Sequence, residues 1–110
     1  MNVILKRTCG LLDGSVETAT SLLKAMASKH RLLVLSKLAG REYSVRELEQ
    51  VTGLGQSAMS QHLARLRKDR LVTTRKSAQT VFYRLADYKT REVLETLDYL
   101  YKQDIETPLS

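Results

Sequence analysis

The sequence predicts a mainly α-helical domain that carries one small β-hairpin, and three observations lead to this prediction. Two short helical patterns, at residues 44–51 and 56–68, are separated by a turn that contains two glycines, and such a pair forms a helix-turn-helix. Directly after them, at residues 72–85, apolar residues alternate as they do in strands. Amphipathic helical patterns lie on both sides of this centre. A chain of 110 residues has room for one such domain.

The first part of the chain predicts an arm followed by two helices. The arm is expected because no apolar period is sustained before Ser15. From Ser15 onward, apolar residues recur at a spacing of three and four, which predicts a helix. A second helix is expected around residues 30–39, where Gly40 ends it. The expected arm, domain and C-terminal tail are residues 1–14, 15–103 and 104–110.

The centre of the chain predicts a third and a fourth helix. Ser44 and Glu47 have the spacing of a capping box, in which each side chain accepts a hydrogen bond from the other residue's amide. A short helix is therefore expected from Ser44, followed by a turn at residues 52–55 and a helix at residues 56–68.

The last part predicts a hairpin and a final helix. Two strands are expected at residues 72–75 and 80–85, joined by a basic, polar tip at residues 76–79. The final helix begins near Asp87 and separates apolar from charged residues on two sides. This order of elements is that of a winged helix-turn-helix with an extra helix at each end.

The first and last helices carry apolar residues that so small a domain cannot bury within itself. An apolar surface of this kind on a soluble protein usually marks an interface, so the chain is expected to form a homodimer through these two helices. The residues expected at this interface are Val16, Leu22, Leu23, Val93, Leu94, Leu97, Leu100 and Tyr101.

The positive charge is concentrated in one stretch of the chain. Residues 55–84 contain seven basic residues and one acidic residue, and the other residues contain eleven of each. The formal net charge of +6 therefore comes from this stretch alone. An even coat of charge would indicate only solubility, whereas a concentrated one indicates a polyanionic partner, since lysine and arginine release counterions when they contact phosphates.

The helix at residues 56–68 is expected to contact double-stranded DNA. The N-terminal part of such a helix reaches base edges in the major groove. There the amide of Gln56 can both donate to and accept from adenine, and the short side chains of Ser57 and Ser60 allow a close approach. The alternative is that these polar side chains only solvate an ordinary surface helix. The neighbouring cations and the hairpin favour DNA contact over this alternative. The DNA-facing candidates of this helix are Gln56, Ser57, Ser60, Gln61, His62 and Arg65.

Two groups of candidates have clear alternatives. His62 lies beside the apolar residues and is either a phosphate contact or a packed histidine bonded to backbone, while His30 is expected to be structural or on the surface. A charged hairpin tip is usually only solvated, but this one follows a recognition helix at the spacing of a wing. The wing candidates for backbone or minor-groove contact are Arg75, Lys76, Gln79 and Thr80.

Other classes of protein are not supported by the sequence. No apolar run has the length that spans a bilayer, and residues 3–7 do not form a secretory signal, so a cytoplasmic protein is expected. Cys9 is the one cysteine and allows no internal disulfide. A bystander thiol is the favoured interpretation, and a link between the Cys9 residues of two copies is the redox alternative. The sequence contains no nucleophile with a base, no paired carboxylates and no phosphate-binding loop, so neither an enzyme nor a cofactor is expected.

Three segments resemble the ArsR (SmtB-type) family of small bacterial dimeric repressors. The resemblance extends over about residues 21–101 and is most specific at residues 23–27, 54–67 and 75–83. It is strongest to the branch that contains the sulfide and persulfide sensors, the haemolysin regulator of vibrios and the rhizobial nodulation repressor. The resemblance implies a homodimer built on the first and last helices, a palindromic operator and repression by occlusion of a promoter.

Two departures from the family concern helix ends. Gly55 stands where close relatives usually have a capping serine, and it caps a helix more weakly. Arg70 stands where glycine is usual, so a left-handed conformation is expected at this arginine.

The other departures concern the family's sensors. Ser36 and Lys102 stand at the two positions where thiol sensors of this branch have cysteines. Ser44 and Arg46 stand where metal sensors have cysteines in the third helix, and the last helix has no histidine. The sequence therefore predicts neither the thiol switch nor a metal site, and it leaves the effector open. A relaxed, nucleoid-type DNA binder and a winged-helix module that binds another protein stay as alternatives to a sequence-specific repressor.

Overall fold

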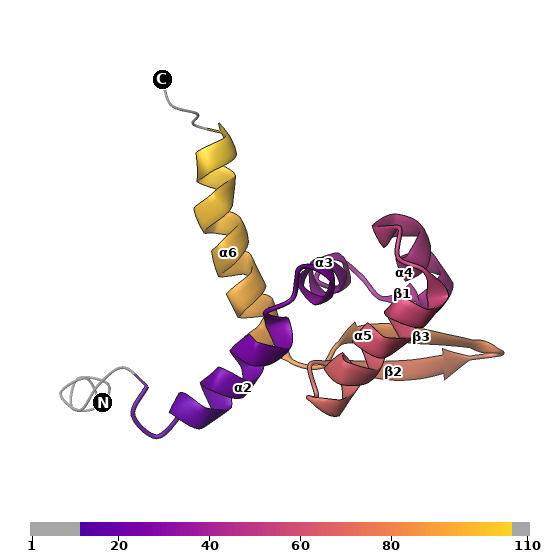
Figure 1. The fold of residues 1–110 in the computed structure, drawn as a ribbon, viewed down its shortest axis with the longest axis horizontal. Helices are drawn as coiled ribbons and strands as arrows, with labels where there is room; N and C mark the ends of the chain where they lie inside the picture. The colour runs from indigo at the N-terminus through magenta and orange to yellow at the C-terminus, as the bar shows by residue number, and fades with distance from the viewer. Residues whose placement is uncertain (1–11, 107–110) are drawn as a thin grey trace.

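The computed structural model describes residues 12–106, which form helices and a small antiparallel sheet (Figure 1). Cys9 and most of the expected arm lie outside the described residues. The described elements, in chain order, are α2 (Val16–Met26), α3 (Lys29–Leu38), β1 (Tyr43–Ser44), α4 (Val45–Thr52), α5 (Gln56–Lys68), β2 (Val72–Ser77), β3 (Thr80–Leu85) and α6 (Tyr88–Glu106).

The expected order of helices and the hairpin is confirmed, with two differences. A third strand, β1, pairs with β3, so the sheet has the order β1-β3-β2 instead of two strands. This strand has only two residues, and the second of them, Ser44, both pairs in the sheet and caps α4, where the sequence predicts the start of a helix. The last helix continues to Glu106, beyond its expected end at Gln103.

The ends of the two helices in the helix-turn-helix are set by local backbone features. The Ser44 amide donates to Oε1 of Glu47 at 2.9 Å, and the Glu47 amide donates to Oγ of Ser44 at 3.2 Å. Gly53 ends α4 in the left-handed region, at a φ of 77°. Arg70 has a φ of 63°, which confirms the left-handed conformation expected after α5.

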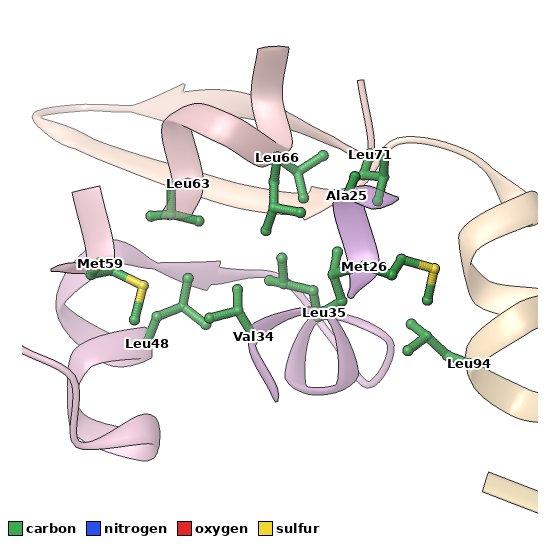
Figure 2. Packing of buried hydrophobic residues seen from close by; sticks show 12 residues of the cluster. Ala25, Met26, Val34, Leu35, Leu48, Met59, Leu63, Leu66, Leu71 and Leu94 are labelled. Carbon is green, nitrogen blue, oxygen red and sulfur yellow. The ribbon is translucent and has the colours of Figure 1, made fainter. Parts of the chain in front are cut away.

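The core lies between α3 and the helices and hairpin around it. Figure 2 shows Leu35 of α3 at its centre, with Leu48 and Met59 at one end and Met26 and Leu94 at the other. Leu35, Leu48 and Met59 are each 0% exposed. One side chain from each of several elements thus fills the same volume, which holds α4 and α5 at a fixed angle.

The last helix leaves the body of the protein after its first turns (Figure 1). Leu94 packs into the core, and the Arg91 guanidinium donates to the carbonyl of Ala39 at the end of α3. Farther along, Leu100 is 50% exposed and Tyr101 is 62% exposed. The C-terminal half of α6 therefore carries large apolar side chains that its own chain leaves at least half exposed.

Candidate nucleic-acid interface

The fourth expected helix, α5, presents a polar side to solvent. Met59, Leu63 and Leu66 turn into the core and are at most 2% exposed. The intervening positions point outward, because a helix repeats every 3.6 residues. The exposed candidates from the sequence are Gln56, Ser57, Ser60, Gln61 and Arg65. Arg65 donates from Nε to Oδ2 of Asp69 at 2.6 Å, so its guanidinium is already paired on the helix.

A groove separates α5 from the sheet and contains cations that the site prediction did not name. Arg67 and Lys68 line this groove of about 420 Å³ together with the ring of Tyr83. Ser60 and Ala64 form its α5 wall. Ser60, Ala64 and Arg67 are four and three residues apart, and Ala64 and Lys68 are four apart, which is the spacing of one helix face. This spacing is the signal in the sequence that places Arg67 and Lys68 beside the wing.

The wing has two different faces, which follow from its register. Tyr83 and Leu85 pack against the core, and their partners across the hairpin are Thr74 and Val72. Paired residues share a face and the faces alternate, so Lys76 lies on the face that α5 covers. Figure 1 shows α5 across this face, with the tip of the hairpin extending past it. The exposed wing candidates are Arg75, Lys76, Gln79 and Thr80.

Arg75 lies on the opposite face of the wing and is already paired. Its partner in the register is Phe82, and its guanidinium carbon is 4.7 Å from the centre of that ring. Nε of Arg75 donates to Oε1 of Glu42 at 2.7 Å, and Nη2 donates to the same oxygen. These hydrogen bonds lower the pKa of Glu42 and raise the pKa of Arg75. Two of the three guanidinium nitrogens of Arg75 are thus engaged with Glu42, so a phosphate that contacts this arginine would share it with that carboxylate.

His62 lies at the edge of the buried side of α5 and contacts His30 of α3. The two ring centroids are 5.6 Å apart, with the planes tilted by 57°. Among the described residues, no hydrogen bond joins either imidazole to the backbone. The expected alternative for His62, a ring nitrogen bonded to backbone, is therefore not what the structure contains, and His30 is a ring partner on the surface.

The candidates for the dimer interface differ in exposure. Val16 and Leu23 of α2 are 57% and 56% exposed, and Leu100 and Tyr101 of α6 are similar. The residues Leu22, Val93 and Leu97 are half-buried. Leu94 is only 7% exposed and packs in the core of its own chain, which leaves it little surface for a partner.

The positions where sensors of the family have cysteines are occupied by other residues in this chain. Ser36 lines a mainly apolar cavity of about 690 Å³ between α3 and α6, and its hydroxyl donates to the carbonyl of Leu33 at 2.7 Å. Across the described part of the chain, no three side chains of His, Cys, Asp or Glu are grouped as metal ligands would be. Within residues 12–106, no helix combines the length and the apolar composition that a membrane crossing requires.

The comparison with known proteins identifies the family of this fold. Residues 28–74 match the model of the arsR family of bacterial regulatory proteins. The transcriptional activator HlyU of Vibrio cholerae is 53% identical over 85 residues, which are 77% of this chain and 79% of that protein. The chain belongs to the ArsR family. The family resemblance of the sequence is thereby confirmed.

Other relatives agree with this ArsR-family assignment. The nodulation protein NolR of Rhizobium meliloti is 42% identical to this ArsR-family chain over 88 residues, which are 80% of this chain and 72% of NolR. The crystal structure of the transcriptional repressor BigR of Xylella fastidiosa superposes with a TM-score of 0.78 at 34% identity. The match covers 81% of this chain and 91% of BigR. The winged helix-turn-helix fold is therefore shared by a relative whose name states that it is a repressor.

Proposed function

We propose that this chain is a transcriptional regulator that binds a palindromic DNA operator through α5 and the wing. The observation that supports it best is the surface of α5. Gln56 and Ser57 are exposed at its N-terminal end, and Arg67 and Lys68 line the groove beside it. Side chains suited to base edges are thus flanked by side chains suited to phosphates, which is the division of roles in protein–DNA interfaces.

The proposed binding unit is a homodimer formed by α2 and α6. Val16, Leu23 and Leu100 are each at least half exposed on these two helices. Burying them against a second copy would remove apolar surface from water. A two-fold dimer would also present one α5 to each half of a palindrome, in successive turns of the major groove.

We propose repression as the outcome of binding. A dimer that covers a promoter blocks transcription without any further contact, whereas activation requires a surface for another protein. Names of relatives support both outcomes, because BigR is named a repressor and HlyU an activator. Regulation of transcription is common to them, and repression is the simpler mechanism for a domain of this size.

The proposal is tested by the ratio of affinity for operator DNA to affinity for random DNA. A genome-wide binding footprint supplies the operator, and gel shifts supply the two affinities. Gln56→Ala and Ser57→Ala are expected to lower the ratio by about tenfold each, since a lost base contact costs about 1–3 kcal/mol. Lys76→Ala is the matched control: it should weaken both affinities equally. The salt dependence should correspond to about 6–10 phosphate contacts per dimer.

Two outcomes of this experiment would contradict the proposal. An equal loss with all three variants would support the nucleoid-type alternative. Absence of any DNA binding at low salt, with the helices intact by circular dichroism, would favour the module that binds another protein.

The protein is expected not to release DNA in response to polysulfide or zinc. A thiol switch needs two sulfurs that can join, and Ser36 and Lys102 stand at the two sensor positions. The measurement is a gel-shift titration on the operator with polysulfide, peroxide, zinc and chelator, beside the variant Cys9→Ser. Release by polysulfide in the natural protein but not in Cys9→Ser would make Cys9 the sensor and refute the prediction.

A further inference from the structure

The contact between His30 and His62 joins the helix α3 to the flank of the recognition helix. Their ring centroids are 5.6 Å apart, and His30 is exposed while His62 is half-buried. In the described part of the chain, every side-chain nitrogen or oxygen that is fully buried has a hydrogen-bond partner. The ring nitrogens of His62 have no such partner, so they reach solvent. The pair can therefore still donate hydrogen bonds to a ligand.

The charges around the pair favour an anion. Arg31 is held in place, because its Nε donates to the carbonyl of Ala25 at 2.6 Å and its Nη2 donates to that of Lys24 at 3.3 Å. The pKa of His62 is lowered mainly by partial burial, and to a smaller extent by the charges of Arg31 and His30. No carboxylate is among the groups that act on His62.

A metal ion fits this place poorly. A stable site needs three or four ligands, and no group of three such side chains exists within the described residues. The fixed charge of Arg31 would also repel a dication. A phosphate, by contrast, accepts hydrogen bonds from protonated imidazoles and gains from the same charge.

The position of the pair matches where a phosphate would lie. A helix of about 10–12 Å diameter fills the major groove of about 12 Å width, so a phosphate strand runs along each of its flanks. The helical repeat places Arg65 and His62 on the flank of α5 opposite Arg67, which lines the groove beside the wing. The wing-side flank thus has its cations in Arg67 and Lys68, and the α3-side flank has the histidine pair.

We propose that His30 and His62 together bind a backbone phosphate of DNA, and that the pair takes up protons when it does so. This inference rests on the proposed function, because it assigns a contact within the same DNA complex. A bound phosphate stabilises protonated imidazoles, and at His62 it would offset the partial burial and the neighbouring charges that lower the pKa of this ring. Binding raises the pKa of the rings, so protons are taken up and DNA affinity increases as the pH falls.

The test compares DNA affinity at about pH 6 and at about pH 8, on either side of the usual histidine pKa. The natural protein is expected to bind at least about fivefold more tightly at the lower pH, since a rise of about one pKa unit at one ring already has this effect. His30→Gln and His62→Gln should each lose most of this difference. His30→Lys keeps a cation at both pH values and should bind more tightly than the natural protein at about pH 8.

A matched control separates charge from titration. Lys29→Gln removes the charge of a neighbouring lysine and leaves both histidines in place, so it should change the affinity equally at both pH values. Circular dichroism of each variant shows whether its helices are intact. An unchanged pH dependence in both glutamine variants would overturn the phosphate contact.

The experiment distinguishes failure of this inference from failure of the proposed function. A phosphate contact is independent of sequence, so the pH dependence should appear on random DNA as well as on the operator. If the natural protein binds operator and random DNA equally well but keeps the pH dependence, only the sequence-specific function is refuted. NMR titration of the two rings provides the second measurement: short duplex DNA should raise both pKa values. A rise with inorganic phosphate but none with DNA would overturn the proposal in favour of a free-anion site.

Discussion

Replacement of Leu100 by glutamate is expected to produce a monomer and to reduce operator affinity by about 100- to 10,000-fold, the usual gain from linking two binding modules. The leucine is 50% exposed on the half of α6 that leaves the body, so the fold does not depend on it. A carboxylate there would have to be buried without a partner in the proposed dimer. Sedimentation and gel shifts measure the two effects together.

The control for this variant is Glu95→Lys, which changes charge on the polar side of the same helix. It is expected to leave the dimer intact. A natural protein that sediments as a monomer with intact helicity would contradict the proposed interface. So would a Leu100→Glu variant that is still dimeric.

Replacement of Leu35 by alanine is expected to lower the free energy of unfolding by about 2–5 kcal/mol. Leu35 is 0% exposed and lies between the two ends of the core in Figure 2. The cavity would remove the support shared by α4, α5 and α6, so DNA affinity should fall with stability. A loss of this size is a large part of the total stability of a small domain.

Urea denaturation at fixed protein concentration provides this measurement, because dimer stability depends on concentration. Leu12→Ala is the matched control, since Leu12 is 52% exposed and surface changes usually alter stability by less than about 0.5 kcal/mol. A loss below about 1 kcal/mol for Leu35→Ala would contradict the central place of this residue.

The sequence predicts well those parts of the site that depend on neighbours along the chain. The capping box of Ser44 and Glu47 lies within one helical turn, and the buried side of α5 follows from a single repeat. The left-handed Arg70 was expected from the family resemblance, because glycine is usual at this position in relatives, and the conformation itself involves only the turn between a helix and a strand. Each of these features involves residues within a few positions of one another.

Contacts between distant segments could not be predicted in this way. Glu42 and Arg75 are 33 residues apart, and nothing in the local pattern of either residue indicates the other. The pairing distinguishes Arg75 from Lys76, whereas the sequence treats these two wing cations as equivalent. Strand β1 was missed for the same reason, since two residues have no period of their own and become a strand only beside β3.

The sequence by itself therefore determined the order of the helices and the hairpin, the polar side of α5 and the place where positive charge is concentrated. These properties follow from helical and strand periods and from composition. The tertiary structure alone decided that Leu94 belongs to the core of its own chain and that His30 meets His62. Both outcomes depend on how α3 packs against α5 and α6. Packing angles arise from the shapes of many side chains at once, and no single stretch of sequence contains them.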